Sequence, residues 1–337
     1  MDASVTQPTQ QEQDTAWSPG GERLTATARA MLAAMDSVVD GKHGAVRTAL
    51  LVLLAGGHLL VEDVPGVGKT LLARALARTV GGTVKRIQFT PDLLPGDVTG
   101  VSVFNQDRHT FEFRPGAVFA NVVIGDEINR ASAKTQSALL ECMEEHQVTV
   151  DGTTHRLDEP FMVVATQNPV ESEGTYPLPE AQRDRFMARI TMGYPDADAE
   201  LQMLRTHQNP LPSSAPVNRL QQVATTEEVL RMIEAVSRVH VSDPVARYVV
   251  DLGRACREHP EVLVGASPRS LLQLLRAAKA EAAISGRAFV TPQDVAAVVP
   301  VVFPHRLMLR RRSTDEAAQA DAATERILHS VPVPAGP

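Results

Sequence analysis

The feature that most constrains the fold of this 337-residue chain is a glycine-rich turn at residues 63–70, Asp-Val-Pro-Gly-Val-Gly-Lys-Thr. An apolar run, Ala49–Val61, precedes the turn, and a segment rich in alanine and leucine follows it. A glycine-rich turn that joins a strand to a helix beginning with Lys-Thr is typical of a phosphate-binding loop. The sequence therefore predicts an α/β fold that binds a nucleotide.

Each residue type in this turn has a physical role in binding phosphate. Gly66 and Gly68 have no Cβ, so the backbone can direct several N–H groups at phosphate oxygens, and the following helix N-terminus adds a favourable dipole. We expect Lys69 to reach the β- and γ-phosphates and the Thr70 hydroxyl to bind Mg²⁺. The predicted nucleotide-binding set is Asp63, Val64, Pro65, Gly66, Val67, Gly68, Lys69, Thr70 and Leu71.

One residue departs from the usual phosphate-loop pattern, G-x-x-x-x-G-K-[ST]. Asp63 occupies the position of the first glycine. A carboxylate at this position would lie near the negatively charged phosphates and repel them, unless its side chain points away.

Two further groups of polar residues follow apolar strands. Residues 122–125 lead into Asp126 and Glu127, and residues 161–165 lead into a polar run that includes Asn168. Because the carboxyl ends of parallel strands line the nucleotide crevice, these side chains should face the phosphates. We expect Asp126 to bind Mg²⁺, directly or through water, Glu127 to be the base that orients the attacking water, and Asn168 to hold that water.

Two arginines are candidates for stabilising charge in a transition state. Arg183 and Arg185 flank Asp184 where the nucleotide domain ends, a position that suits insertion into the site of a neighbouring subunit. A surface arginine is more commonly a solvated charge. Ser267-Pro268-Arg269 has the pattern of a helix start, which places Arg269 in a first turn.

Composition divides the chain into four parts. Residues 1–21 are polar and are predicted to be a disordered tail, 22–208 form the nucleotide-binding core, 217–310 are predicted to be a helical lid after the linker Asn209–Pro216, and 311–337 form a C-terminal tail. Two segments of the core, at about 90–120 and 146–158, alternate around turn signals and predict hairpins. Periodicity does not decide whether Val46–Leu54 is a helix or a buried strand.

Charge and apolar content argue against several classes of protein. The formal charge, 33 − 40 = −7, argues against a general nucleic-acid-binding or membrane-surface protein. The longest apolar run is too short to span a bilayer, and the N-terminus lacks the apolar core of a signal peptide. Cys142 and Cys256 have no metal-ligand spacing and are predicted to be free thiols in a reducing compartment. We therefore expect a soluble cytoplasmic protein.

These motifs together resemble those of the MoxR family of AAA+ ATPases, over about Leu24–Leu307 and hence most of the chain. Two runs resemble this family specifically: Asp126-Glu127-Ile128-Asn129-Arg130-Ala131, and Ala165-Thr166-Gln167-Asn168-Pro169 through Glu173-Gly174-Thr175-Tyr176-Pro177-Leu178-Pro179-Glu180-Ala181-Gln182.

The resemblance implies an AAA+ αβα sandwich with a parallel sheet, followed by an all-α lid, in a ring that is usually hexameric and binds ATP and Mg²⁺ between subunits. The segment 90–120 would be the helix-two insert, and the second hairpin would precede the first sensor. Asn168 would be sensor one, Arg185 the arginine finger and Arg269 sensor two on the lid. Arg183 stands where the family more often has an apolar residue, which leaves the choice of finger open. Asp63 is compatible with the family, in which Glu-Asp before Val-Pro-Gly is common.

The resemblance also implies a function and a site arrangement. Arginines from the lid and from another subunit would converge on the phosphate loop, and ATP hydrolysis would drive lid rotation that moves the inserts. The output would be chaperone-like remodelling or maturation of partner proteins, typically with von Willebrand factor A domain proteins. A chelatase-like subunit for metal insertion is a close alternative. A motor acting on nucleic acid is disfavoured, because the hairpins carry only Arg108, Arg114 and Arg156 against several acids.

Overall fold

The computed structural model describes residues 20–64, 66–168, 176–194, 197, 200–201, 216–311 and 315–334. Several sequence predictions therefore lie outside the described residues. They are the tail up to residue 19, Pro65 of the phosphate loop, the part of the family motif at 169–175, and nearly all of the linker at 209–216.

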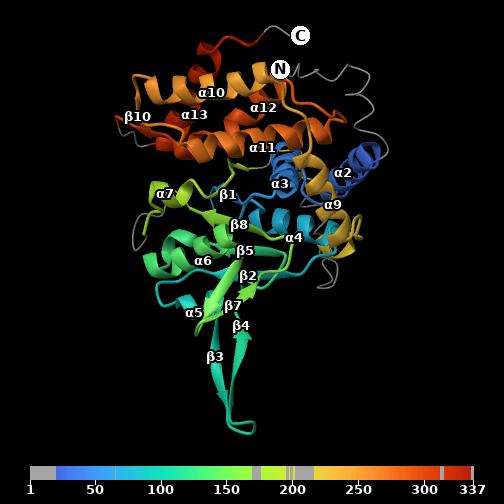
Figure 1. Ribbon diagram of the computed structural model, residues 1–337, viewed down its shortest axis with the longest axis vertical. Helices are drawn as coiled ribbons and strands as arrows, with labels where there is room; N and C mark the ends of the chain where they lie inside the picture. Colours follow the sequence, from blue (N-terminus) through green and yellow to red (C-terminus); the bar gives the residue numbers. More distant parts are fainter. Residues whose placement is uncertain are drawn as a thin grey trace, which may run out of the picture.

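A five-stranded parallel sheet forms the centre of the nucleotide-binding core (Figure 1), with the strand order β2-β5-β8-β1-β9. In register, Leu59 lies opposite Val164 on one side and Ala188 on the other, so the strands run in the same direction and their carboxyl ends lie at one edge of the sheet. The strands are β1 (Leu59–Glu62), β2 (Val84–Gln88), β5 (Val122–Asp126), β8 (Met162–Gln167) and β9 (Ala188–Ile190).

Helices cover both faces of this sheet, as predicted for an αβα sandwich. Leu59 and Val61 belong to an apolar cluster with helices α2 (Gly20–Asp36), α3 (His43–Leu54) and α4 (Lys69–Thr79). Because side chains alternate along a strand, the intervening residues, such as Leu60, point to the other face of the sheet and belong to a second apolar cluster. That face is covered by α5 (Pro95–Thr99) and α6 (Ala133–Glu145).

The segment that periodicity left undecided, Val46–Leu54, is part of helix α3. Eight of the twelve residues of α3 are buried. A helix that is buried nearly all round shows no polar face, so its sequence resembles that of a buried strand.

Both predicted hairpins are present. Strands β3 (Gly100–Asn105) and β4 (Thr110–Pro115) form the longer hairpin, which projects away from the rest of the molecule (Figure 1). Strands β6 (Gln147–Val150) and β7 (Thr153–Arg156) form the shorter one. The two hairpins touch, because the rings of Phe113 and His155 stack with centroids 3.9 Å apart.

The lid is helical, as predicted, and lies at the opposite end of the molecule from the long hairpin (Figure 1). Four of its helices begin at an N-cap whose side chain accepts a backbone N–H, namely Thr225, Ser267, Thr291 and Asp315. Its elements are η3 (Pro216–Arg219), α9 (Thr226–Ser237), α10 (Asp243–Glu258), β10 (Val262–Val264), α11 (Pro268–Ile284), α12 (Pro292–Val302), η4 (Pro304–Arg306), β11 (Met308–Leu309) and α13 (Glu316–Ser330).

Helix α13 corrects the predicted C-terminal tail at 311–337. Its buried residues are Ala320, Ala323, Thr324 and Ile327, which have the i, i+3, i+4, i+7 spacing of one helix face. Asp315 caps the helix by accepting the N–H of Ala318 at 3.0 Å. Only Ile327 of these four buried residues has a large apolar side chain, so the sequence signal of this face is weak, but the lid continues to Ser330. Among the described residues, no helix is both long and apolar enough to cross a membrane.

His58, the residue before β1, is buried between the sheet and α6. Its Nδ1 accepts the N–H of Val163 at 3.0 Å, so the proton lies on Nε2, which donates to the carbonyl of Met143 at 3.0 Å. Burial lowers the pKa of His58 from 6.5 to about 4, because the charged imidazolium would be desolvated.

This environment predicts a loss of stability in mild acid. The unfolded chain takes up a proton near pH 6.5 and the folded chain only near pH 4, so the free energy of unfolding should fall as pH drops through that window, by up to roughly 3 kcal/mol from this group. His58→Gln can keep both hydrogen bonds without titrating, and should flatten the pH dependence in urea unfolding. Exposed His329→Gln is the matched control, and equal slopes for the two variants would contradict the assignment.

Candidate functional site

The phosphate loop connects β1 to α4, as its sequence predicts. Gly66 and Gly68 have φ angles of +87° and +92°, in the left-handed region that favours glycine. Gly68 is the N-cap of α4, and no side chain among the described residues caps that helix. A Cβ at Gly66 would meet nothing within 4 Å, so the loop is open on that side. These features fit a site for an anion at the helix N-terminus.

The side chain of Asp63 points away from the loop. Its Oδ2 accepts the backbone N–H groups of Met192 and Gly193 at 2.6 and 2.5 Å, and its Oδ1 accepts the N–H of Val64 at 2.8 Å. The main-chain carbonyl of Asp63 accepts from the Lys69 ammonium at 2.7 Å. The carboxylate that departs from the usual pattern therefore fastens the start of the loop to the chain beyond β9.

Asp126 lies at the carboxyl end of β5 with its carboxylate buried. Its Oδ1 accepts from the Thr166 hydroxyl at 3.3 Å, and its Oδ2 is paired with Arg86 of β2. Asp126 and the Thr70 hydroxyl are oxygen donors of the type that Mg²⁺ prefers, alongside phosphate oxygens.

Glu127 follows directly in a left-handed conformation, with φ of 57°. Its N–H donates to the Thr166 hydroxyl at 3.0 Å. Its Oε2 accepts from the Gln88 amide at 2.8 Å and pairs with Arg130 at 3.2 Å. Glu127 therefore has a fixed backbone, and its carboxylate is oriented by two neighbours.

The end of β8 joins the acidic pair to the phosphate loop. Thr166 contacts Asp126 and Glu127, while the carbonyl of Gln167 accepts the N–H of Asp63 at 3.2 Å. Asn168 follows and is buried. The structure thus brings the loop, the acidic pair and Asn168 together at the carboxyl end of the sheet, where the sequence predicts them.

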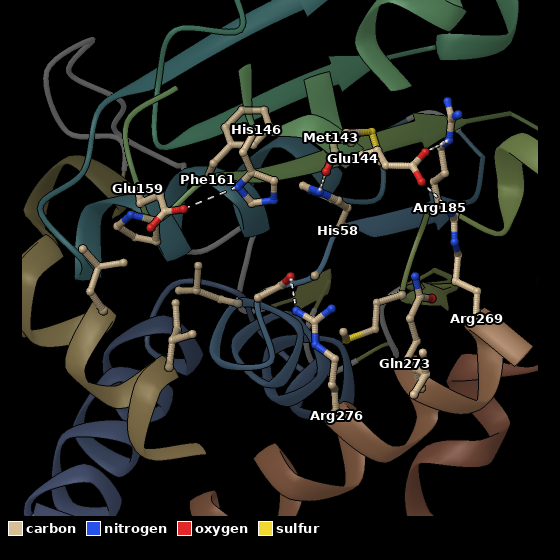
Figure 2. A pocket seen from close by; sticks show the side chains of 18 residues that line it. His58, Met143, Glu144, His146, Glu159, Phe161, Arg185, Arg269, Gln273 and Arg276 are labelled. Carbon is tan, nitrogen blue, oxygen red and sulfur yellow. Dashed lines mark hydrogen bonds and ion pairs between the residues drawn. The ribbon is translucent and has the colours of Figure 1, made fainter. Parts of the chain in front are cut away.

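Arg185 and Arg269 lie elsewhere. Both pair with the same carboxylate, that of Glu144 at the end of α6, and the Arg185 Nε is 3.0 Å from Glu144 Oε2 (Figure 2). They line a cavity of about 380 Å³ whose other walls include Gly57 and Phe161. Those two residues precede β1 and β8, so the cavity lies at the amino end of the sheet.

This position corrects one expectation from the sequence. Arginines from the lid were expected to converge on the phosphate loop, but within one chain the loop leaves β1 at the end of the strand opposite to Arg269. Four residues of β1 span about 13 Å at about 3.3 Å per residue. A helix start can be recognised from sequence, but the end of the sheet against which that helix packs cannot.

Arg183 differs from Arg185 in its surroundings. It ends helix α7 (Glu180–Arg183), and its side chain is partly buried. Burial lowers the pKa of His305 well below its usual value, and the charge of Arg183 adds a smaller effect in the same direction. Of the two flanking arginines, Arg185 is the one that shares a carboxylate with Arg269.

The sequence analysis missed three residues of these sites. Gln88 ends β2 at the carboxyl end of the sheet, and the rule that found Asn168 after β8 would also have pointed to it. Thr166 was noticed only as part of a family run. Glu144 carries no local signal, because it lies in an ordinary helix and is defined by partners distant in sequence.

Comparisons with known proteins agree with this geometry. The model of the family described as "ATPase family associated with various cellular activities (AAA)" matches residues 58–188, and the model of an AAA lid domain matches residues 254–327. Chaperone MoxR1 of Mycobacterium tuberculosis is 41% identical over 329 residues, which cover 94% of this chain and 86% of that protein. The chain belongs to the MoxR family of AAA+ ATPases.

Two further relatives support this family and its fold. Protein YeaC of Bacillus subtilis is 48% identical over 89% of this MoxR-family chain and 92% of its own length. A crystal structure from Cytophaga hutchinsonii, assigned as an ATPase, matches with a TM-score of 0.84 and 38% identity, covering 94% of this chain and 97% of that one. The predicted AAA+ fold and the MoxR resemblance are therefore confirmed.

The contacts of Asp63 predict that restoring the usual glycine would be harmful. Asp63→Gly leaves three backbone N–H groups without their acceptor, which should lower the free energy of unfolding by roughly 2 to 4 kcal/mol. Binding of a fluorescent ADP analogue should weaken too, because the loop loses its anchor. Asp107→Gly in the exposed hairpin turn is the control. Unchanged stability and tighter nucleotide binding in Asp63→Gly would refute this role.

Proposed function

We propose that this MoxR-family protein hydrolyses ATP at sites formed between the subunits of a ring, usually a hexamer in this family. One observation carries the proposal. Arg185 and Arg269 converge on one anion, the Glu144 carboxylate, at the amino end of the sheet, whereas the phosphate loop and the acidic pair lie at the carboxyl end. Both arginines can therefore serve a nucleotide only on a neighbouring subunit.

The proposed chemistry uses this chain's residues in separate roles. The phosphate loop and Lys69 bind the phosphates, and Glu127 orients and deprotonates the attacking water. Asn168 holds the same water from the end of β8. The neighbour's Arg185 and Arg269 stabilise the charge that develops on the transferred phosphoryl group. Mg²⁺, when bound by Thr70, Asp126 and the phosphates, would supply further charge neutralisation.

We propose that the output is remodelling or maturation of a partner protein, with a von Willebrand factor A domain protein as the expected partner. The long hairpin supports this role, because it projects from the body of the molecule (Figure 1) and exposes large apolar side chains. Phe111 is 73% exposed and packs edge-on against Phe104 near the turn. A relative, MoxR1, carries the name chaperone.

Two variants separate nucleotide binding from hydrolysis. Lys69→Ala should weaken ATP binding, whereas Glu127→Gln should retain binding and lower turnover by about a hundredfold or more, since it removes the base. Phosphate release and binding of a fluorescent nucleotide are the measurements. Lys134→Ala and Glu141→Gln, both exposed on α6, are the controls. Undiminished hydrolysis in Glu127→Gln would exclude it as the base.

Mixing of subunits tests the intersubunit site. Arg185→Ala should lower turnover by about a thousandfold, the scale of an arginine finger, and Arg183→Ala should lower it far less. Adding Lys69→Ala subunits, which retain their arginines, should restore hydrolysis at the phosphate loops of Arg185→Ala subunits. If turnover in the mixture never exceeds the sum of the turnovers of the two variants measured separately, the arginine does not act between subunits.

The hairpin predicts a partner contact that does not affect hydrolysis. Phe111→Ser should weaken binding of a purified von Willebrand factor A domain protein by about tenfold, as expected for an exposed aromatic anchor, and leave basal turnover unchanged. Binding is measured with Glu127→Gln subunits and ATP, by titration calorimetry. Val333→Ser removes a comparable exposed apolar side chain outside the hairpin. Equal affinities of the two variants would exclude Phe111 from the contact.

A further inference from the structure

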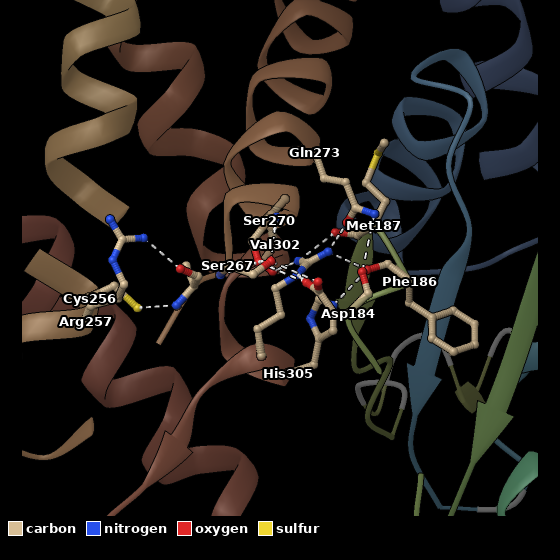
Figure 3. A network of polar contacts seen from close by, with 12 residues as sticks. Asp184, Phe186, Met187, Cys256, Arg257, Ser267, Ser270, Gln273, Val302 and His305 are labelled. Carbon is tan, nitrogen blue, oxygen red and sulfur yellow. Dashed lines mark hydrogen bonds and ion pairs between the residues drawn. The ribbon is translucent and has the colours of Figure 1, made fainter. Parts of the chain in front are cut away.

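Asp184, the residue between Arg183 and Arg185, binds three side chains of the lid (Figure 3). Its Oδ2 accepts from the Ser267 hydroxyl at 2.9 Å, and its Oδ1 accepts from the Ser270 hydroxyl at 2.9 Å and from Arg306 Nε at 2.8 Å. The sequence analysis assigned no role to Asp184, and it recognised Ser267 only as the start of a helix. One carboxylate of the core is thus bound at the start of α11 and at η4.

The lid also holds the main chain on both sides of Arg185. The carbonyl of Asp184 accepts from the Gln273 amide at 3.3 Å. The carbonyl of Phe186 accepts from Arg306 at 2.6 Å and from His305 Nε2 at 3.0 Å. The carbonyl of the next residue, Met187, accepts from Arg306 at 3.2 Å. The backbone that carries Arg185 is therefore fixed by lid side chains before and after it.

These contacts form a seam between core and lid, and Arg306 makes the seam energetically costly to open. Its side chain is only 2% exposed. Each of its five N–H groups has an acceptor, which are Asp184, Met187, Val302, Phe186 and Gln273. Burial lowers its pKa to about 10, although Asp184 opposes that shift. Separating lid from core here would leave a buried cation without its partners, which is strongly unfavourable.

The Asp184 carboxylate also fixes the position of Arg269 on the lid, through Ser267 and Ser270. Ser267 is the N-cap of α11 and Ser270 completes its capping box, so both serines have fixed positions. Arg269 lies between them in the first helical turn. The positive end of the α11 dipole also favours the negative charge of Asp184 at this place.

We propose that Asp184 is a positioning residue for hydrolysis, which holds Arg185 and Arg269 in one fixed relation so that they enter the neighbour's site as a pair. This inference rests on the proposed intersubunit ATPase. Two arginines on separately moving domains would lose rotational freedom each time they engaged a phosphate. Fixing them in advance removes that cost, and a misplacement of about 1 Å can cost about a hundredfold in rate.

Asp184→Asn is the direct test. It removes the charge that faces Arg306 and weakens the link to α11, so kcat should fall between about tenfold and a hundredfold. The affinity for a fluorescent ADP analogue should not change, because the phosphate loop lies at the other end of the sheet. Added Lys69→Ala subunits, with intact Asp184 and arginines, should restore turnover at the phosphate loops of the variant. Weakened ADP binding, or absence of restoration, would overturn the inference.

A second variant covers the case in which Asp184→Asn fails to fold. Ser267→Ala removes a helix cap and one bond to Asp184, and Thr291→Ala removes a cap of the same kind from α12, away from the arginines. Both should lose similar thermal stability, but only Ser267→Ala should lose turnover, by about tenfold, with restoration by Lys69→Ala subunits. Equal turnover in the two cap variants would overturn the positioning role.

The same experiments separate this inference from the proposed function. If wild-type protein turns over ATP and Arg185→Ala is restored in mixtures while Asp184→Asn and Ser267→Ala are not, then only the positioning role fails. If Arg185→Ala itself cannot be restored, then the intersubunit site fails first, and the inference fails with it.

Discussion

Parallel pairing of five strands is the constraint on which the rest of this structure depends. Because the five strands run in the same direction, every connection that follows a strand emerges at one end of the sheet. The phosphate loop, the acidic pair and Asn168 follow strands and are gathered at that end. Glu144, Arg185 and Arg269 surround the segments that precede β1 and β8, at the other end. The polarity of the sheet thus separates the groups that would bind phosphate from those that would neutralise it.

The seam between core and lid gives this separation mechanical consequences. One apolar cluster runs from Leu59 and Val61 of the sheet to Leu274 of α11 and Val299 of α12. At the amino end the seam is closed by the fully bonded guanidinium of Arg306. Lid and core therefore share both a hydrophobic interior and a buried ion pair at this place. Rotation of the lid about this seam, expected from the family resemblance, would have to break both. Relative motion between neighbouring subunits needs neither to break.

Most of the fold could be predicted from local patterns, because each pattern has a local cause. Asp151 and Gly152 adopt positive φ in the hairpin turn that their sequence predicts, and Ser267 and Thr291 cap the helices that follow them. The elements that could not be predicted from the sequence also have physical explanations. Helix α3 has no polar face, and the buried side of α13 has only one large apolar side chain, Ile327, so neither shows the contrast between apolar and polar faces on which periodicity depends.

The candidate site divides in the same way. Asp126, Glu127 and Asn168 could be located in advance because the direction of a strand fixes the end at which its last residue emerges. The place of Arg269 could not, since it depends on how α11 packs against the core. The contacts of Asp63 were equally hidden, because its partners Met192 and Gly193 lie about 130 residues further along the chain.

The shared carboxylate of Glu144 gives the arginine pair an electrostatic property of its own. Two guanidinium groups and one carboxylate carry a net charge of +1 rather than +2, and all three side chains remain partly exposed to water. In the proposed ring, a nucleotide on the neighbouring subunit would compete with Glu144 for the same two cations. A triphosphate competes better than a diphosphate because it carries more negative charge. The contact between subunits would then depend on which nucleotide is bound, because the arginine pair would exchange Glu144 for the phosphates of the neighbour's nucleotide.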